Sequence, residues 1–205
     1  MNNGARGDTE HPPVRIEERG ALAVIRINRP AQRNSLSVAT LEELERAFAR
    51  LTQNDRLKAI VFTGTDDVFA SGADIRELRA LTPDSAREYA LRGQRLFQQI
   101  ADARPLTIAA VNGYCIGGGL DLALACRLRV ASPRAVFAHP GARLGIITGW
   151  GGTQRLPRLV GTARALEMFT TARRVNADEA LEIGLVTRLH TDPLACALEI
   201  AARRN

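Results

Sequence analysis

Apolar and polar residues alternate along the N-terminal part of the chain. From residue 14 to residue 28 the alternation runs on both sides of Gly20, which predicts a β-hairpin. From residue 38 to residue 54 the apolar positions recur every three or four residues instead, and they place Leu41 on a buried face. This spacing predicts a helix, and Ser37 stands where it can cap the first turn.

Strands and helices alternate through the rest of the chain. The expected elements are a strand at 57–64, a loop entering a helical turn at 65–81, a helix at 82–103, a strand at 106–112, a glycine-rich loop at 113–119, a helix at 120–126, and strands at 127–132 and 135–138. A helix-rich C-terminal third follows, with a capping box at 176–179 and a helix stop at Gly184. The order predicts an α/β fold with crossover connections. The polar segment 1–13 predicts a disordered leader.

Composition and charge narrow the class of protein. The chain has 205 residues, of which 45% are hydrophobic and 24% charged, so one soluble globular domain is expected. A net charge of +6 is compatible with nucleic acid, an anionic membrane surface or a phosphorylated ligand as partner. The arginines are scattered, without a basic block or interleaved aromatic residues, which argues against nucleic acid. A solvated arginine-rich surface and a site for an anionic small molecule remain as alternatives.

The cysteines and the missing signals indicate the compartment. Cys115, Cys126 and Cys196 have no CxxC spacing, which is typical of a reducing environment. The N-terminus has no apolar signal-peptide core, and no apolar run is long enough to span a membrane. These observations predict a cytoplasmic protein without a membrane partner.

Several common catalytic motifs are absent from the sequence. The chain has no P-loop, no dinucleotide-binding GxGxxG after a strand, no GxSxG elbow and no HExxH helix. The histidines, at positions 11, 139 and 190, lack companions at metal-ligand spacing. We therefore expect neither a metal site nor a permanently bound cofactor.

Two glycine-rich loops offer backbone amides to a ligand. In "VNGYCIGGGLDLALAC" (111–126) a strand runs into four glycines and directly into a helix, and "ASGADIREL" (70–78) repeats the arrangement with small residues. Two such loops could each direct one N–H at a single oxygen, as in an oxyanion hole. The alternative reading of each loop is a tight turn that lets a helix pack closely on a strand.

Five stretches occur in an order that resembles the enoyl-CoA hydratase/isomerase (crotonase) family: "NRPAQRNSL", "FASGADI", "IAAVNGYCIGGGLDLALAC", "GGTQRLPRLVG" and "ADEALEIGLV". The resemblance covers residues 14–190, and it implies a crotonase-like (ClpP/crotonase) superhelix of ββα units. It also implies an acyl-CoA thioester as substrate, with coenzyme A present only as part of that substrate, and assembly as a homotrimer or a dimer of trimers (a hexamer). Residues 191–205 would begin a helical region that is shorter than in the family.

The resemblance assigns residues to the expected site. The oxyanion donors would be the backbone amides of Ala73 and Gly118. Gln32 and Arg33 would lie at the nucleotide end of coenzyme A, where arginine can meet phosphate. The remaining expected contacts to acyl-CoA are Asp74, Ile75, Arg76, Gly117, Gly141 and Trp150.

The acid–base residues depart from the family pattern. A hydratase of this family uses two glutamates on one water molecule, and here Asp121 takes the first position while Gly141 takes the second. His139, two residues before Gly141, is either a substitute base or a histidine bonded into the wall. Asp121 is either catalytic or an acid that favours the dipole of its helix.

Four functions stay open at this point. The first is an enoyl-CoA hydratase, a lyase of fatty acid metabolism that adds water to a 2-enoyl-CoA. The second is an enoyl-CoA isomerase or another crotonase-type reaction that needs fewer carboxylates. The third is an acyl-CoA-binding protein with vestigial catalysis, and Gly141 favours the second and third on chemical grounds. The fourth, a nucleic-acid binder, is suggested by the charge alone.

Overall fold

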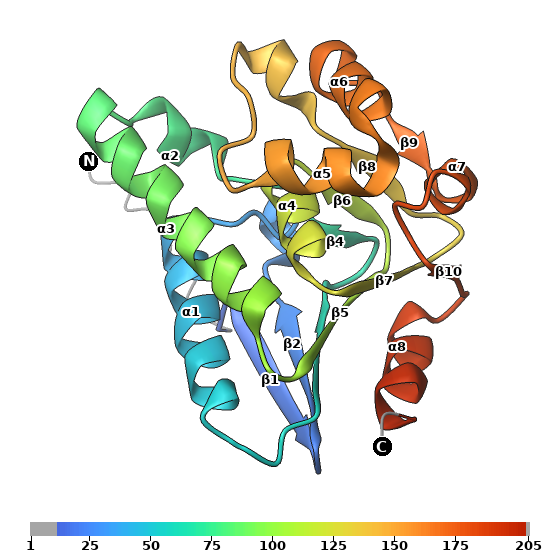
Figure 1. Ribbon diagram of the computed structural model, residues 1–205. Helices are drawn as coiled ribbons and strands as arrows, with labels where there is room; N and C mark the ends of the chain where they lie inside the picture. Colours follow the sequence, from blue (N-terminus) through green and yellow to red (C-terminus); the bar gives the residue numbers. More distant parts are fainter. Residues whose placement is uncertain (1–11, 204–205) are drawn as a thin grey trace.

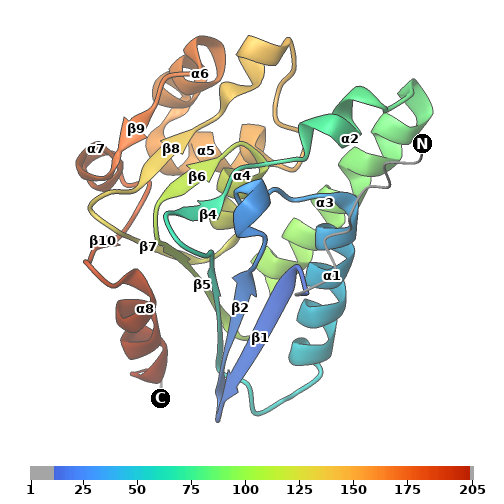
Figure 2. The same ribbon diagram turned by 180° about the vertical axis from the view of Figure 1, so that it is seen from behind.

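The computed structural model describes residues 12–203, so most of the predicted leader lies outside the described residues. Its strands form two sheets (Figures 1 and 2). The larger sheet has the order β1 (Val14–Arg19), β2 (Leu22–Ile27), β3 (Ala59–Thr63), β5 (Leu106–Val111), β7 (Leu128–Ala131) and β10 (Arg188–Leu189). The smaller sheet has the order β4 (Val68–Ala70), β6 (Tyr114–Ile116), β8 (Val136–Ala138) and β9 (Val175–Asn176).

From β3 to β8, the first strand of each successive pair belongs to the larger sheet and the second to the smaller one. β3, β5 and β7 are parallel in the larger sheet, and the strands that follow them, β4, β6 and β8, are parallel in the smaller one. Helices connect the pairs, so the chain advances as a superhelix of strand–strand–helix units with crossover connections. The helices are α1 (Val38–Thr52), α2 (Ile75–Arg79), α3 (Pro83–Asp102), α4 (Gly118–Ala125), α5 (Gly152–Val160), α6 (Thr162–Thr171), α7 (Ala177–Glu182) and α8 (Pro193–Ala202).

Both faces of the larger sheet are covered. Alternate residues of β2 enter different apolar clusters: Ile25 packs with the residues of α1 and α3, and Val24 packs with Ala197 and Ala201 of α8. Figure 1 shows the sheet between α1 and α3 on one side and α8 on the other. Such two-sided burial explains why the central strands are continuously apolar. Helix α8 falls within the predicted C-terminal helical region.

Most predicted elements are confirmed, because their signals are local. Ser37 caps α1 by accepting a hydrogen bond from Thr40, and Thr82 and Ser85 form a capping box at the start of α3. Asn176 accepts from the Glu179 amide and starts α7. The loop assignments at 65–81 and 113–119 were wrong in part, since each contains a three-residue strand, β4 or β6. These strands form because β6 pairs with β4 and with β8. Pairing with distant segments leaves no local pattern in three residues, so the sequence did not predict the strands.

A buried arginine fixes the C-terminal end of α4. Arg129, on β7, donates from Nε to the carbonyl of Leu185 at 2.8 Å and from Nη1 to the carbonyl of Cys126 at 2.6 Å. Its guanidinium is buried, and the carbonyls at a helix C-terminus carry partial negative charge that favours a cation there. This anchor helps to hold α4 in position, and the N-terminus of that helix enters the site described next.

Candidate active site

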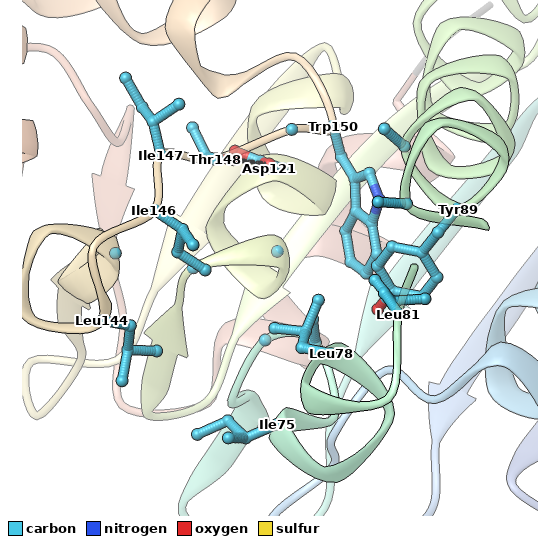
Figure 3. A pocket seen from close by; sticks show the side chains of 18 of the residues that line it. Ile75, Leu78, Leu81, Tyr89, Asp121, Leu144, Ile146, Ile147, Thr148 and Trp150 are labelled. Carbon is cyan, nitrogen blue, oxygen red and sulfur yellow. Dashed lines mark hydrogen bonds between the residues drawn. The ribbon is translucent and has the colours of Figure 1, made fainter. Parts of the chain in front are cut away.

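A cavity of about 540 Å³ opens between α2, α3, the start of α4 and the segment 139–150 (Figure 3). Its wall is largely apolar. The sequence-predicted residues that line it are Ala73, Ile75, Gly117, Gly118, Asp121, His139, Gly141 and Trp150. The cavity therefore collects most of the expected site from four separate parts of the chain.

The two glycine-rich loops meet at the cavity. A Cβ atom added to Gly72 would lie 3.3 Å from the Gly118 nitrogen, so the two backbones are in close contact. Gly72 and Gly117 have φ values of +99° and +54°, which favour glycine. Gly118 is the first residue of α4, where an amide has no acceptor within the helix. Neither its amide nor that of Ala73 donates any of the loop and cap hydrogen bonds found within residues 12–203.

Hydrogen bonds from neighbouring elements hold both loops. The Leu36 amide donates to the Gly72 carbonyl at 2.7 Å, and the Gly117 amide donates to the Ala138 carbonyl at 2.8 Å. Because these bonds use the backbone groups next to Ala73 and Gly118, the amides of those two residues keep a fixed place at the cavity.

Asp121 and His139 form a buried pair beside the cavity. Asp121 Oδ1 and His139 Nε2 are 3.5 Å apart, and their side chains are 1% and 3% exposed. Neither atom has a hydrogen-bond partner within the described part of the chain. Both side chains pack against the start of α5, since a Cβ on Gly152 would lie 2.1 Å from Asp121 Oδ1 and 3.1 Å from His139 Cε1. Both residues also line the cavity, so the pair lies in the cavity wall and not on the outer surface.

Burial moves the two pKa values in opposite senses. It raises the pKa of Asp121 to about 7, while hydrogen bonds from Thr148 and from the Trp150 backbone act against the rise. It lowers the pKa of His139 to about 4. At neutral pH the imidazole is therefore uncharged, and the carboxyl group exchanges between its acid and its carboxylate forms. A carboxyl group with a pKa near the working pH is suited to general acid–base chemistry.

Thr148 is a site residue that the sequence analysis missed. Its hydroxyl donates to Asp121 Oδ2, and Figure 3 shows the two side chains side by side at one end of the cavity. The only available signal was a hydroxyl residue inside a glycine-rich segment. That signal does not identify its partner, which lies 27 residues away.

Gly141 has no side chain that could transfer a proton, and only its backbone takes part in the site. A Cβ at this position would lie 2.5 Å from the Ile146 carbonyl oxygen, and the Ile146 amide donates to the Gly141 carbonyl at 3.0 Å. The position at which the family pattern places a glutamate is here part of a tight loop contact. The cavity lining contains no second carboxylate beside Asp121.

Four predicted acyl-CoA residues do not line the cavity. Asp74 caps α2, and its carboxylate pairs with the Arg76 guanidinium at 2.8 Å, which lowers the pKa of Asp74 to about 2. The Arg33 guanidinium lies 5.1 Å from the centre of the Tyr114 ring, and Gln32 ends a short 3₁₀ turn. The predicted contacts of Gln32 and Arg33 with the nucleotide end of coenzyme A, and of Asp74 and Arg76 with acyl-CoA, stay predictions.

The part of the chain from residue 12 to residue 203 offers neither a membrane span nor a metal-binding cluster. No helix in this range has both the length and the apolar character to cross a bilayer. No three His, Cys, Asp or Glu side chains in this range are grouped as a metal site requires.

Comparison with known proteins gives consistent matches. Residues 17–198 match the family model described as enoyl-CoA hydratase/isomerase. The chain is 39% identical over 177 residues to the short-chain-enoyl-CoA hydratase of Clostridium acetobutylicum, covering 86% of this chain and 68% of that protein. It is 42% identical over 175 residues to the crotonyl-CoA hydratase of Syntrophomonas wolfei, covering 85% and 67%.

Solved structures agree with these matches. An enoyl-CoA hydratase from Bacillus anthracis superposes with a TM-score of 0.89 at 34% identity, covering 93% of this chain and 76% of the other. DspI of Pseudomonas aeruginosa superposes with a TM-score of 0.89 at 36% identity, covering 98% and 83%. The predicted superhelix of ββα units is confirmed by these superpositions.

Proposed function

Because the chain belongs to the enoyl-CoA hydratase/isomerase (crotonase) family, we propose that its cavity binds the acyl end of a 2-enoyl-CoA and that the enzyme adds water across the double bond. Coenzyme A then enters as part of the substrate and leaves with the product. The proposal includes a homotrimer, or a dimer of trimers, working in the cytoplasm.

The observation that carries the proposal is the meeting of the two amide loops at the cavity. The amides of Ala73 and Gly118 stand in adjacent backbones, and neither donates a loop or cap hydrogen bond within residues 12–203. A thioester oxygen placed between them would receive two N–H donors. Addition of a nucleophile at C3 moves charge onto that oxygen, so donors preorganised there lower the barrier, by about 3 to 4 kcal/mol each in comparable sites.

One carboxyl group can complete both proton transfers. The Asp121 carboxylate takes a proton from water as the water oxygen bonds to C3 and the C2–C3 π electrons move into the thioester enolate. The protonated Asp121 then delivers that proton to C2, and the enolate returns to a thioester. Between these steps the uncharged His139 would accept a hydrogen bond from the acid form only after moving closer, since its Nε2 lies 3.5 Å from Oδ1.

Hydration by this route will be slow. A positioned acid or base contributes about 10²- to 10⁴-fold to a reaction rate, and only one carboxyl group is present at the cavity. The side chain of Asp121 is also one methylene shorter than that of a glutamate, so its carboxylate starts further from the water molecule. Slow hydration of crotonyl-CoA, rather than a diffusion-limited turnover, is the expected behaviour.

Double-bond isomerisation is the second candidate function, and the presence of a single carboxyl group at the cavity favours it. Moving a proton between C2 and C4 of an enoyl-CoA requires one base, an enolate oxygen site and no activated water. The single carboxyl at the cavity meets that requirement. Acyl-CoA binding with vestigial catalysis would follow if neither reaction occurs.

The test combines binding with turnover. Calorimetric titration with acetyl-CoA measures binding, loss of the enone absorbance of crotonyl-CoA measures hydration, and 3-hexenoyl-CoA offers the isomerisation reaction. In Ala73→Pro the backbone donor is removed, and we expect kcat to fall by about 10²- to 10³-fold. Ala73→Gly keeps the donor and is the matched control. Failure of acetyl-CoA to bind, or equal turnover in both variants, would contradict the proposal.

A further inference from the structure

Trp150 is wedged between α3 and the start of α4 at the side of the cavity where Gly118 lies. A Cβ on Gly118 would lie 2.3 Å from Cζ3 of the indole, and a Cβ on Gly93 of α3 would lie 2.3 Å from Cδ1. The ring therefore touches the backbone of α4 at the oxyanion residue and the backbone of α3 on its other side. Only glycine at both positions leaves room for it.

Aromatic neighbours and backbone hydrogen bonds keep the indole in place. The centres of the Tyr89 and Phe97 rings lie 5.3 Å and 5.6 Å from that of Trp150, the latter edge-to-face. Arg155 donates to the Trp150 carbonyl at 3.1 Å, and Gln94 donates to the Gly149 carbonyl at 2.7 Å. Trp150 is 3% exposed, so the ring behaves as a fixed wall rather than a mobile side chain.

The opposite side of the cavity is built differently. Leu144, Ile146 and Ile147 are between 48% and 64% exposed, and they form the rim on the solvent side. Figure 3 shows this rim facing Trp150 and Tyr89 across the cavity. The wall beside the oxyanion amides is therefore rigid, whereas the rim toward solvent is open.

We propose that Trp150 is the specificity-determining residue of the site and that it restricts the enzyme to short acyl groups. The inference rests on the proposed function. A thioester oxygen held by the Gly118 amide places the first acyl carbons directly against the indole. A longer chain meets the ring where a smaller side chain would leave space, so it must bend toward the rim. There Leu144, Ile146 and Ile147 are open to solvent on one side, so the chain buries less apolar surface than it would in an enclosed pocket.

The experiment measures binding of saturated acyl-CoAs, which requires no turnover. Calorimetry with butyryl-, hexanoyl- and octanoyl-CoA should give a dissociation constant at least tenfold larger for octanoyl-CoA than for butyryl-CoA. Trp150→Ala should reduce that ratio at least tenfold, mainly by tighter binding of octanoyl-CoA. Trp150→Phe keeps an aromatic ring next to Tyr89 and Phe97, and it should give an intermediate ratio; this variant decides the question if the alanine variant does not fold.

The outcomes separate the two proposals. Equal binding of all three ligands by the wild-type protein, or an unchanged ratio in a folded Trp150 variant, overturns the role of Trp150 and leaves the proposed function standing. Absence of binding to every acyl-CoA, including butyryl-CoA, refutes the proposed function itself.

Discussion

Replacing Asp121 by asparagine will abolish turnover and stabilise the fold, and the stabilisation will grow with pH. The substitution keeps the shape of the side chain and removes the ionisable group. Thr148 can still donate to the amide oxygen, and the new N–H₂ can donate to His139 Nε2, which has no partner in the described residues. The variant therefore loses the acid–base group without leaving an unpaired polar atom.

The magnitude follows from the raised pKa. The folded protein holds the Asp121 proton up to a pKa of about 7, whereas the unfolded chain releases it near 3.8. Between these values the folded state binds the extra proton, so this group makes stability fall as pH rises from about 4 to about 7. The interval corresponds to about 4 kcal/mol in total at 1.36 kcal/mol per pH unit, of which about 2 kcal/mol is lost between pH 5.5 and pH 8.

Urea denaturation of both proteins at pH 5.5 and pH 8 measures the effect. The stability advantage of Asp121→Asn should be about 2 kcal/mol larger at pH 8 than at pH 5.5. His139, whose pKa is lowered to about 4, adds stability as pH rises through 4 to 6.5; it is present in both proteins and cancels in the difference to first order. Asp67→Asn, at an exposed acid, is the control. An advantage that does not change with pH, or a variant with full turnover, would refute the reasoning.

Three other substitutions test separate parts of the site. Gly141→Glu restores the missing carboxylate but brings a Cβ to 2.5 Å from the Ile146 carbonyl oxygen. The free energy of unfolding should fall by about 1 to 3 kcal/mol, and crotonyl-CoA hydration should become at least tenfold faster. An unchanged rate would show that the second carboxylate is not limiting. Thr148→Val removes the hydrogen bond that lowers the pKa of Asp121, so the rising limb of the pH–rate profile should move to higher pH; an unmoved limb would exclude this coupling. Tyr89→Phe removes a buried hydroxyl with no partner in the described residues, so the free energy of unfolding should rise by about 1 kcal/mol, and a loss would mean that the hydroxyl has a partner in solution.

The sequence predicted what depends on neighbouring residues and missed what depends on distant ones. Ser37 could be identified as a helix cap because its acceptor role concerns only the next three residues. Tyr114 begins a strand whose partners come from two other units, and no local pattern distinguishes that strand from a loop. Asp121 was predicted at the site, but its raised pKa depends on burial by segments that come together only in the folded chain.

The contacts of Trp150 have a consequence for how such a site can change over generations. The indole fits only while positions 93 and 118 lack side chains, so substitutions at these three positions depend on one another. A methyl group at either glycine is compatible with the fold only after the ring has been replaced by something smaller. The size of the pocket can therefore change only if Trp150 is replaced first. Replacing either glycine while the indole is still present would disrupt the packing.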